Sequence, residues 1–267
     1  MSSGYADSLE PIEFLARSAA RVETIESLLA AGTLDRPAIN DRISASRSTI
    51  TRTLSDFEDR GWVERHNGTY GLTPMGEVLG GEFLELLETV ELAEGCSTFL
   101  AAFPYTDYEI ELSALRDATV TVATETEPFA PVRVHAESLE DASTYRGLLP
   151  ALVVKGKADI HERVQAGELE VEFVASEAVA DAMTSGEHAS LFRSQLEHPG
   201  FAVHVSESVP DFFLSLIDEE LVQIGVMDDD GSPTAVLEST DPEVRSWADG
   251  LFEDRRAAAQ PLTADAG

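Results

Sequence analysis

The sequence is poor in the residues that would build several kinds of site or scaffold. Its 267 residues include a single cysteine, Cys96, so neither an internal disulfide framework nor a cysteine-rich zinc site is expected. No apolar run approaches the roughly 18–20 residues that cross a bilayer, and residues 1–10 lack the basic and apolar regions of a secretory signal. These absences predict a soluble, cytoplasmic protein with no membrane partner.

Basic residues are also scarce, and lysine most of all. The chain has 50 acidic residues against 18 basic ones, a net charge of −32, and its only lysines are Lys155 and Lys157. Such an acidic, lysine-poor surface resembles that of proteins from extreme halophiles. Molar salt shortens the Debye length to about 3 Å there and screens self-repulsion. The alternative is an acidic protein of ordinary salt with one face that avoids unwanted partners.

The shortage of bases is not evenly spread. Residues 1–75 hold eight arginines and eleven acids, a net charge of −3, whereas residues 76–267 hold ten bases and 39 acids, a net charge of −29. An acidic surface disfavours nucleic acids, because phosphate contacts need cations. The nearly neutral first quarter is therefore the part of the chain whose charge permits such contacts.

Hydrophobic periodicity in this first quarter predicts three helices. Apolar residues at three- and four-residue spacing over residues 12–29 indicate one amphipathic helix that ends at Gly32. Pro37 suits the first turn of a short second helix. Ser46 is a good N-cap for a third helix, expected over residues 47–60. Two short helices joined by a tight turn form a helix-turn-helix unit.

A hairpin is expected directly after the third helix. Asn67-Gly68 stands between two short alternating segments, which is the strongest short-range hairpin signal. Helix, helix, turn, helix and hairpin is the element order of a winged helix-turn-helix. We assign this domain to residues 1–75.

The residues themselves carry a family resemblance. Residues 43–54, ISASRSTITRTL, resemble the turn and recognition helix of archaeal and bacterial winged-helix regulators. The wing strand at residues 70–72 and the Thr-Pro-Met-Gly run at residues 73–76 continue the likeness. Over about 65 residues the chain is similar to archaeal TrmB-like, MarR-like and methanogenesis-regulator-like proteins. The resemblance implies a DNA-binding transcriptional regulator.

The exposed face of the expected recognition helix has no acid before Asp56. Short hydroxyl side chains let a helix approach base edges, while arginine contacts guanine or phosphate. Donors on the wing suit the DNA backbone or minor groove. The alternatives are a merely solvated face and an adaptor that binds other proteins of the transcription machinery. We expect contacts with double-stranded DNA from Arg36, Ser46, Arg47, Ser48, Thr49, Thr51, Arg52, Arg65, His66 and Asn67.

Residues 76–110 are predicted to connect the winged helix to a second domain. An apolar stripe from Val78 to Leu92 indicates another amphipathic helix, which ends near Gly95. Such a helix pairs two protomers in this type of regulator, and a homodimer would match palindromic half-sites. The alternative is that the stripe packs only on its own domain. Residues 96–104 are expected to form a hinge.

Residues 111–258 alternate β-branched runs with helical stretches, which predicts an α/β layered sheet. Residues 259–267 are expected to be a disordered tail. The predicted strands are residues 119–123, 169–174, 201–205, 212–217, 221–227 and 234–238. The predicted helices are residues 139–152, 158–165, 177–183, 189–197 and 242–258.

Residues 212–253 resemble the effector domains of TrmB-like and methanogenesis-regulator-type proteins, which resemble phospholipase D in fold. The predicted fold class is therefore an α+β winged helix-turn-helix followed by an α/β sensory domain resembling a non-catalytic phospholipase D-like fold. Phospholipase D chemistry needs a histidine with a lysine two residues on, and none of the six histidines has one. We see no other catalytic, cofactor or metal motif. We expect no enzyme and no cofactor; a phospholipase D-like enzyme is the rival.

A local group of bases stands out in this acidic region. A basic cluster beside a helix start could hold an anion, so a small anionic metabolite is the expected effector. The alternative is a tolerated surface loop. The candidate ligand-binding residues are Arg146, Lys155, Lys157, His161 and Arg163.

Overall fold

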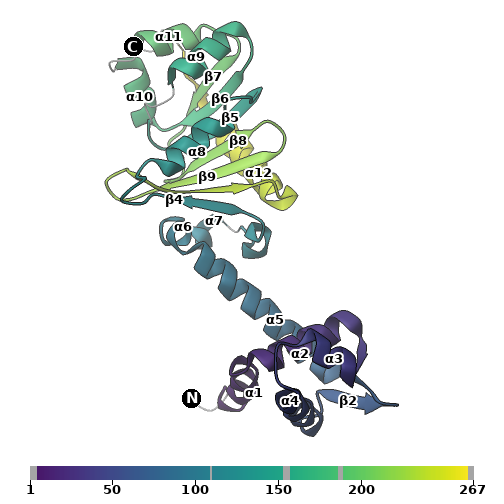
Figure 1. Ribbon diagram of the computed structural model, residues 1–267. Helices are drawn as coiled ribbons and strands as arrows, with labels where there is room; N and C mark the ends of the chain where they lie inside the picture. The colour runs from purple at the N-terminus through teal and green to yellow at the C-terminus, as the bar shows by residue number, and fades with distance from the viewer. Residues whose placement is uncertain (1–4, 109, 153–156, 186–188, 264–267) are drawn as a thin grey trace. The chain divides into compact units, whose positions relative to one another are not determined.

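The computed structural model describes residues 5–108, 110–152, 157–185 and 189–263 (Figure 1). The chain divides into two compact units, residues 1–91 and residues 92–267. Within the described residues, no helix is both long enough and apolar enough to cross a membrane.

The first unit is a winged helix-turn-helix, and its hairpin belongs to a three-stranded antiparallel sheet of order β1-β3-β2. Asn67 and Gly68 adopt positive φ at the hairpin turn, which confirms the predicted hairpin. Its elements are α1 (Ala6–Ala16), α2 (Ala19–Ala31), β1 (Thr33–Asp35), α3 (Arg36–Arg42), α4 (Arg47–Asp59), β2 (Val63–His66), β3 (Thr69–Leu72) and α5 (Pro74–Gly95), whose last residues belong to the second unit.

The single helix predicted over residues 12–29 is wrong, because the chain breaks between α1 and α2. Ser18 is extended, with φ −152° and ψ 111°, and caps the start of α2. Apolar residues of both helices enter one core, so the hydrophobic period continues across the break and hides it. Strand β1 was not predicted, because three residues are too few to show a period.

The core of the first unit is built around Phe57, which is fully buried. The Phe14, Phe57 and Trp62 rings lie 5.6–5.9 Å apart, centroid to centroid. Two glycines bring α5 close to this core. A Cβ on Gly76 would lie 2.0 Å from the Trp62 carbonyl oxygen, and one on Gly80 would lie 2.4 Å from Ile25 Cγ2. Only glycine fits at either position.

The second unit is a mixed eight-stranded sheet of order β11-β7-β6-β5-β8-β9-β10-β4 with helices on both faces. Strands β5, β6 and β7 pair in parallel, and the other pairings are antiparallel. Its elements are α6 (Ser97–Ala102), α7 (Tyr105–Tyr108), the 3₁₀ helix η1 (Leu112–Leu115), β4 (Thr119–Val122), α8 (Ala130–Ser138), β5 (Thr144–Leu149), α9 (Lys157–Ala166), β6 (Glu170–Ala175), α10 (Glu177–Ser185), α11 (Ala189–Leu196), β7 (Phe201–Val205), β8 (Phe213–Ile217), β9 (Leu221–Met227), β10 (Pro233–Ser239), α12 (Pro242–Ala257) and β11 (Gln260–Pro261).

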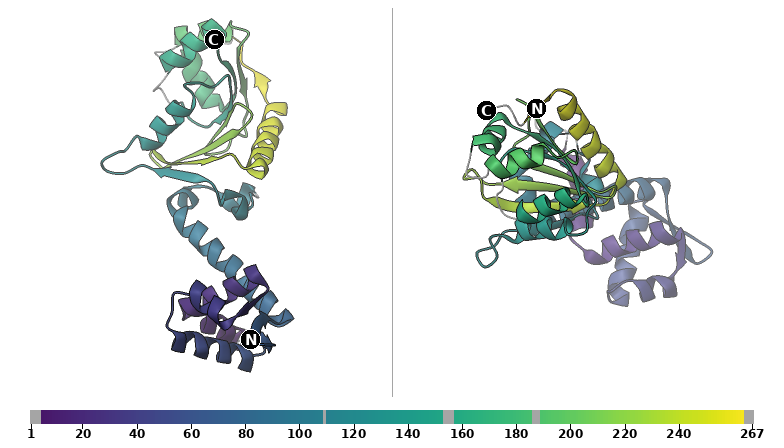
Figure 2. Two further views of the ribbon diagram at one scale, coloured as in Figure 1. Left: turned by 45° about the vertical axis from the view of Figure 1, so that its right-hand side comes forward. Right: turned by 90° about the horizontal axis from the view of Figure 1, so that it is seen from above.

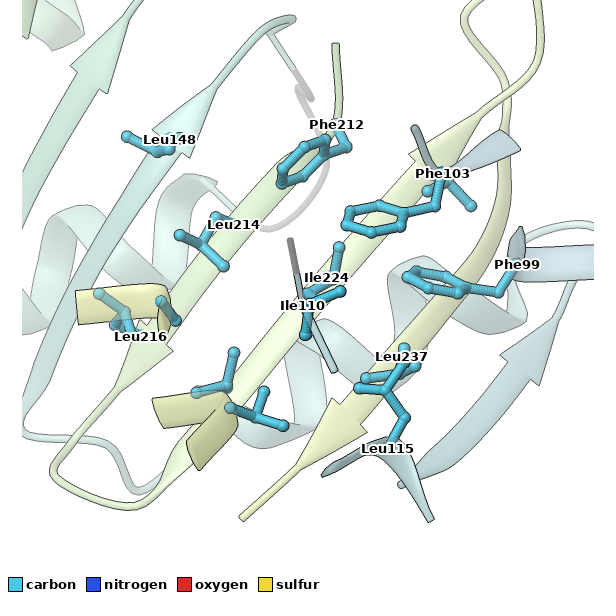
Figure 3. Packing of buried hydrophobic residues seen from close by; sticks show 14 of the residues in the cluster. Phe99, Phe103, Ile110, Leu115, Leu148, Phe212, Leu214, Leu216, Ile224 and Leu237 are labelled. Atoms are coloured by element: carbon cyan, nitrogen blue, oxygen red, sulfur yellow. The ribbon is translucent and has the colours of Figure 1, made fainter. Parts of the chain in front are cut away.

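The two faces of this sheet bury different cores. Helix α12 covers one face, and α8 to α11 lie on the other (Figures 1 and 2). Because side chains alternate along a strand, Leu148 on β5 joins the α12 face, whereas Tyr145 on the same strand faces α9 to α11. Figure 3 shows the α12-face core, in which the Phe103 and Phe212 rings meet at 4.9 Å, centroid to centroid.

The predicted order of a winged helix and then an α/β domain is confirmed, but three local predictions in residues 92–267 are wrong. Residues 139–152 contain strand β5 instead of a helix, because Tyr145, Leu148 and Leu149 have the three- and four-residue spacing that also fits a helix. Residues 96–104 do not form a bare hinge, since Phe99 and Phe103 are buried in the α12-face core. In the predicted disordered tail, β11 pairs with the edge of β7.

Candidate functional sites

Helix α4 begins with a network of hydroxyl groups. The Ser46 side chain caps the helix by accepting a hydrogen bond from the Thr49 amide at 3.2 Å. The same Ser46 hydroxyl lies 2.9 Å from the hydroxyls of Ser48 and Thr49. The Thr51 hydroxyl donates to the Arg47 carbonyl at 2.7 Å. Because these side chains are short, they project little from the exposed side of α4. A large partner could therefore approach the helix backbone closely there.

The arginines of the first unit fall into two groups. Arg17, Arg21 and Arg60 are held in ion pairs with Glu13, Asp56 and Glu10, at 2.9, 3.3 and 2.5 Å. Among the described residues, the arginines of α3 and of the first turns of α4 have no ion pair. Arg47 and Arg52 are also exposed. The unpaired positive charge of this unit therefore gathers on the helix-turn-helix.

The remaining predicted DNA contacts lie on α3 and the hairpin. The Arg36 guanidinium donates to the Thr51 hydroxyl, which brings the start of α3 beside the exposed face of α4. Arg65 and Asn67 are exposed, and the Arg65 guanidinium lies 5.4 Å from the Tyr70 ring centroid. His66 Nε2 lies 3.2 Å from a Glu64 oxygen, with both side chains largely exposed.

The five predicted anion ligands do not form one cluster in the described residues. Arg146 lies on the α12 face of the sheet, paired with Asp249 at 2.5 Å and Glu253 at 3.3 Å. Arg163 lies on the other face.

The other side chains of this group differ in their surroundings. The Arg163 guanidinium donates to the backbone carbonyls of Leu139 and Ala142. His161 Nδ1 is buried without a hydrogen-bond partner in the part of the chain described. Lys155 and the side chain of Lys157 lie outside the described residues.

The second unit contains a cavity of about 260 Å³, partly open to solvent, between the sheet and helices α8 to α11. Its walls are mainly apolar and aromatic, and Gly225 leaves room on the sheet floor. The apolar side chains that define its shape include Phe173, Met183, Phe192, Phe201 and Phe213.

A directed chain of hydrogen bonds forms the polar part of the cavity wall. The Glu238 carboxylate only accepts, so the Gln223 amide nitrogen donates to it at 2.9 Å. The Gln223 carbonyl oxygen then accepts from His135 Nδ1 at 2.6 Å. His135 Nε2 is left to accept from the Tyr145 hydroxyl at 3.2 Å. The chain ends at Ser215, whose hydroxyl lies 3.4 Å from that of Tyr145.

Apart from the Glu238 carboxylate, the side chains in this series of hydrogen bonds are uncharged, because burial disfavours their ionised forms. Burial lowers the pKa of His135 from 6.5, although hydrogen bonding to Gln223 opposes the shift. Burial likewise raises the pKa of Tyr145 to about 12, against the opposing effect of Ser215. The imidazole and the phenol are therefore both neutral at pH 7.

The sequence contains a signal for this cavity that our predictions did not include. In FLSLI and LVQIGVM, Ser215 and Gln223 are lone polar residues in apolar strands, at positions whose neighbours two residues away face the same side. Buried polar side chains of this kind need partners, so they point to a polar network or a ligand. His135 and Tyr145 give no such signal, because the pattern of residues 139–152 predicts a helix. Among the described residues, no group of three or more acidic, histidine or cysteine side chains could hold a metal ion.

Two family models match the chain. Residues 9–95 match the model described as HVO_A0261 N-terminal domain, and residues 128–258 match the model described as methanogenesis regulatory protein FilR1, middle domain. These matches confirm the resemblance to regulators of the methanogenesis-regulator type. A search of curated proteins found no match.

Several solved structures are similar to the chain. TrmBL2, described as an archaeal chromatin protein with a novel mode of DNA binding, is 13% identical over 94% of this chain and 98% of its own, with a TM-score of 0.43. NucT from Helicobacter pylori is 10% identical over 54% of this chain and 98% of its own, with a TM-score of 0.43. The phospholipase D family member Nuc from Salmonella typhimurium is 15% identical over 55% and 99%, with a TM-score of 0.41. Likenesses this distant carry no conclusion about function.

Proposed function

Because the chain is a winged helix-turn-helix regulator that joins a domain of the HVO_A0261 N-terminal type to a FilR1 middle domain, we propose that it binds double-stranded DNA sequence-specifically as a homodimer. Helix α4 is the recognition helix in this proposal, and the second unit senses a small molecule. Effector binding would change the geometry or population of the DNA-binding state, and so the affinity for the operator.

The observation that carries the DNA proposal is the state of Arg47 and Arg52. Both are exposed on the first turns of α4 and have no ion pair within the described residues, in a chain with 50 acids. An arginine in such surroundings would gain from pairing with a carboxylate, yet the acids nearest in sequence are not paired with either. Arg36, beside Thr51, is positioned to extend the same surface to a phosphate.

Two exposed apolar stripes support the homodimer. On α5, Val78, Leu86 and Val90 are 64, 48 and 45% exposed, and at 3.6 residues per turn they fall within an arc of about 120°. On α1, Leu9 and Ile12 are also exposed and one turn apart. Large apolar side chains exposed together on a helix face favour a protein contact surface, although Glu82 and Thr89 interrupt the face of α5. Replacing Leu86 with Glu should therefore shift the mass in light scattering to that of a monomer, whereas Glu at the isolated exposed Leu29 should not.

The charge of the second unit supports a cytoplasm of molar salt as the working environment. Counterion release loses its driving force there, so we propose that hydrogen bonding and shape readout supply more of the DNA affinity than usual. The proposed high-salt environment is tested by measuring the free energy of unfolding in 0.2 M and 2 M potassium chloride. A free energy of unfolding that rises with salt supports it, and one that does not contradicts it.

The DNA proposal is tested by fluorescence anisotropy with DNA from upstream of the protein's own gene. Arg52→Ala should weaken binding at least about 5-fold, because one good base or phosphate contact is worth about 1–3 kcal/mol. Arg17→Ala is the matched control, since it removes the same charge from an exposed arginine that is paired with Glu13. This control should bind within about 2-fold of the wild type.

Two outcomes would contradict the proposal. An equal loss in Arg52→Ala and Arg17→Ala would mean that only general charge matters. No binding to that DNA or to a genome-wide fragment library would favour a winged-helix adaptor of the transcription machinery. Phosphodiesterase turnover by the purified protein would contradict the sensory role that we assign to the second unit.

A further inference from the structure

The cavity in the second unit is lined by a largely buried amide side chain. The Gln195 side chain on α11 is 3% exposed and lines the cavity. Among the described residues, its side-chain amide makes no hydrogen bond, and it is not one of the buried atoms that lack a partner, so it faces the space of the cavity. A ligand group in the cavity can therefore hydrogen-bond this amide in the place of water.

The size and walls of the cavity restrict what that group can belong to. A dry apolar cavity of about 150 Å³ accommodates benzene, so 260 Å³ corresponds to about ten non-hydrogen atoms. Phe173, Phe192 and Phe201 offer ring faces and edges to an aromatic or alicyclic body. Transfer of an ion into such surroundings is costly unless an opposite charge awaits it.

The charged groups at the cavity do not favour an anion. The Arg163 guanidinium keeps its positive charge but is held by two backbone carbonyls, and the exposed Glu140 carboxylate in the wall opposes that charge and repels anions. The hydrogen-bonded groups from Gln223 to Ser215 are neutral and comprise amide, imidazole and hydroxyl groups. Ser215 is the free end of this series, because the Tyr145 hydroxyl already donates to His135.

We propose that this cavity binds an uncharged, mainly aromatic or alicyclic small molecule of about ten non-hydrogen atoms, whose hydroxyl or carbonyl group hydrogen-bonds the Gln195 amide. This ligand class replaces the anionic metabolite expected from the bases. Ligand binding to the cavity does not depend on the DNA proposal. Only the expected change in affinity for operator DNA rests on the proposed function.

Three matched probes test the ligand class with the full-length protein. Naphthalene, 2-naphthol and 2-naphthoate share one ring system and differ by no polar group, a neutral hydroxyl and a carboxylate. Probe fluorescence should report saturable binding of 2-naphthol, about 5-fold weaker binding of naphthalene, and binding of 2-naphthoate weaker by at least about 10-fold.

Two variants locate the site. Gln195→Leu keeps the volume and should make 2-naphthol and naphthalene bind equally. Gly225→Val should remove the binding of both, because a Cβ at Gly225 reaches Phe213 Cβ at an ordinary 3.4 Å and a larger side chain fills the cavity floor. Gly250→Val, on the exposed side of α12, is the control for the same exchange and should bind as the wild type does. Circular dichroism confirms that each variant is folded.

The results separate the two proposals. Preference for 2-naphthoate, unchanged binding by Gly225→Val, or no saturable binding of 2-naphthol overturns the ligand proposal. The anisotropy titration with and without 2-naphthol is a separate measurement. If wild-type protein binds 2-naphthol but no DNA, the proposed function fails and the ligand site stands. If it binds DNA but not 2-naphthol, the ligand site fails alone.

Discussion

The two units present their polar groups in opposite directions. On the first unit, Arg47 and Arg52 are exposed and lack ion pairs among the described residues, whereas Arg17, Arg21 and Arg60 are paired. In the second unit, the polar groups that stand out, Gln195 and Ser215, are buried and face a cavity. Exposed arginines without ion pairs are suited to contact an extended polyanion. Neutral polar groups that face a cavity are suited to bind a small molecule. The state of hydrogen-bond partners thus distinguishes two kinds of site that composition alone would not.

The largest effect should come from removing the core on which the first unit's surface depends. Phe57→Ala should lower the free energy of unfolding of this unit by about 3–5 kcal/mol, because it leaves a cavity among fully buried side chains. Urea unfolding followed by Trp62 fluorescence measures it, since the two rings lie 5.8 Å apart. Leu29→Ala, at a half-exposed position, should cost far less. A similar loss in both variants would contradict the packing described.

The unpaired charge can be tested through salt. Removing both Arg47 and Arg52 should flatten the slope of log affinity against log salt by about 2, if each contacts one phosphate. Anisotropy titrations at several potassium chloride concentrations give the slope. The Arg17→Ala variant should keep the wild-type slope, and an unchanged slope in the double variant would remove these two residues from the DNA contact.

The buried His135, within the hydrogen-bonded series of the cavity wall, should make the stability of the second unit depend on pH. Burial lowers the pKa of His135 in the folded state below 6.5, so the unfolded chain binds the proton first as the pH falls. Stability is therefore full above about pH 6.5 and decreases below it, by up to about 1.4 kcal/mol per pH unit.

Unfolding followed by Trp247 fluorescence between pH 5 and 7.5 measures this dependence. His135→Gln should flatten the profile, whereas His66→Gln, on the exposed hairpin of the first unit, should leave it unchanged. A His135→Gln profile as steep as that of the wild type would show that another group is responsible.

The smallest effect concerns the hydroxyl network at the start of α4. Ser46→Ala should destabilise the first unit by about 1 kcal/mol, because it removes the acceptor for the Thr49 amide. Ser55→Ala is the control, since Ser55 is exposed on the same helix and lies outside the hydroxyl network. Thermal melting monitored at Trp62 compares them, and equal melting temperatures would contradict the capping role.

Much of the fold followed from local signals, and each failure has its own physical cause. The capping residue Ser46 and the Asn67-Gly68 turn act within a few residues, so the sequence displays them directly. Strand β5 was missed because Tyr145 and Leu148 are both apolar, although they belong to opposite faces of the sheet. The buried strand therefore lacks the alternation that identifies a half-exposed one.

The two sites differ in the same way. Helix α4, the proposed recognition helix, is contiguous in sequence, so its exposed residues could be named. The cavity is assembled from residues as distant as His135 and Gln223, which lie 88 positions apart. Its polar groups are single residues in separate apolar strands and helices. Only the sheet order, in which β8 joins β5 and β9, brings them together.

The short strand β11 has a consequence for how this protein behaves in concentrated solution. Gln260 and Pro261 cover the outer edge of β7, and the Leu262 amide donates to the Val203 carbonyl at 2.8 Å. An uncovered strand edge is a template for pairing with other chains. Pro261 presents no amide for a further strand to bond. These few residues thus protect against intermolecular aggregation. Truncation after Ala259 would leave β7 as an unpaired edge strand, which can form hydrogen bonds with strands of other molecules.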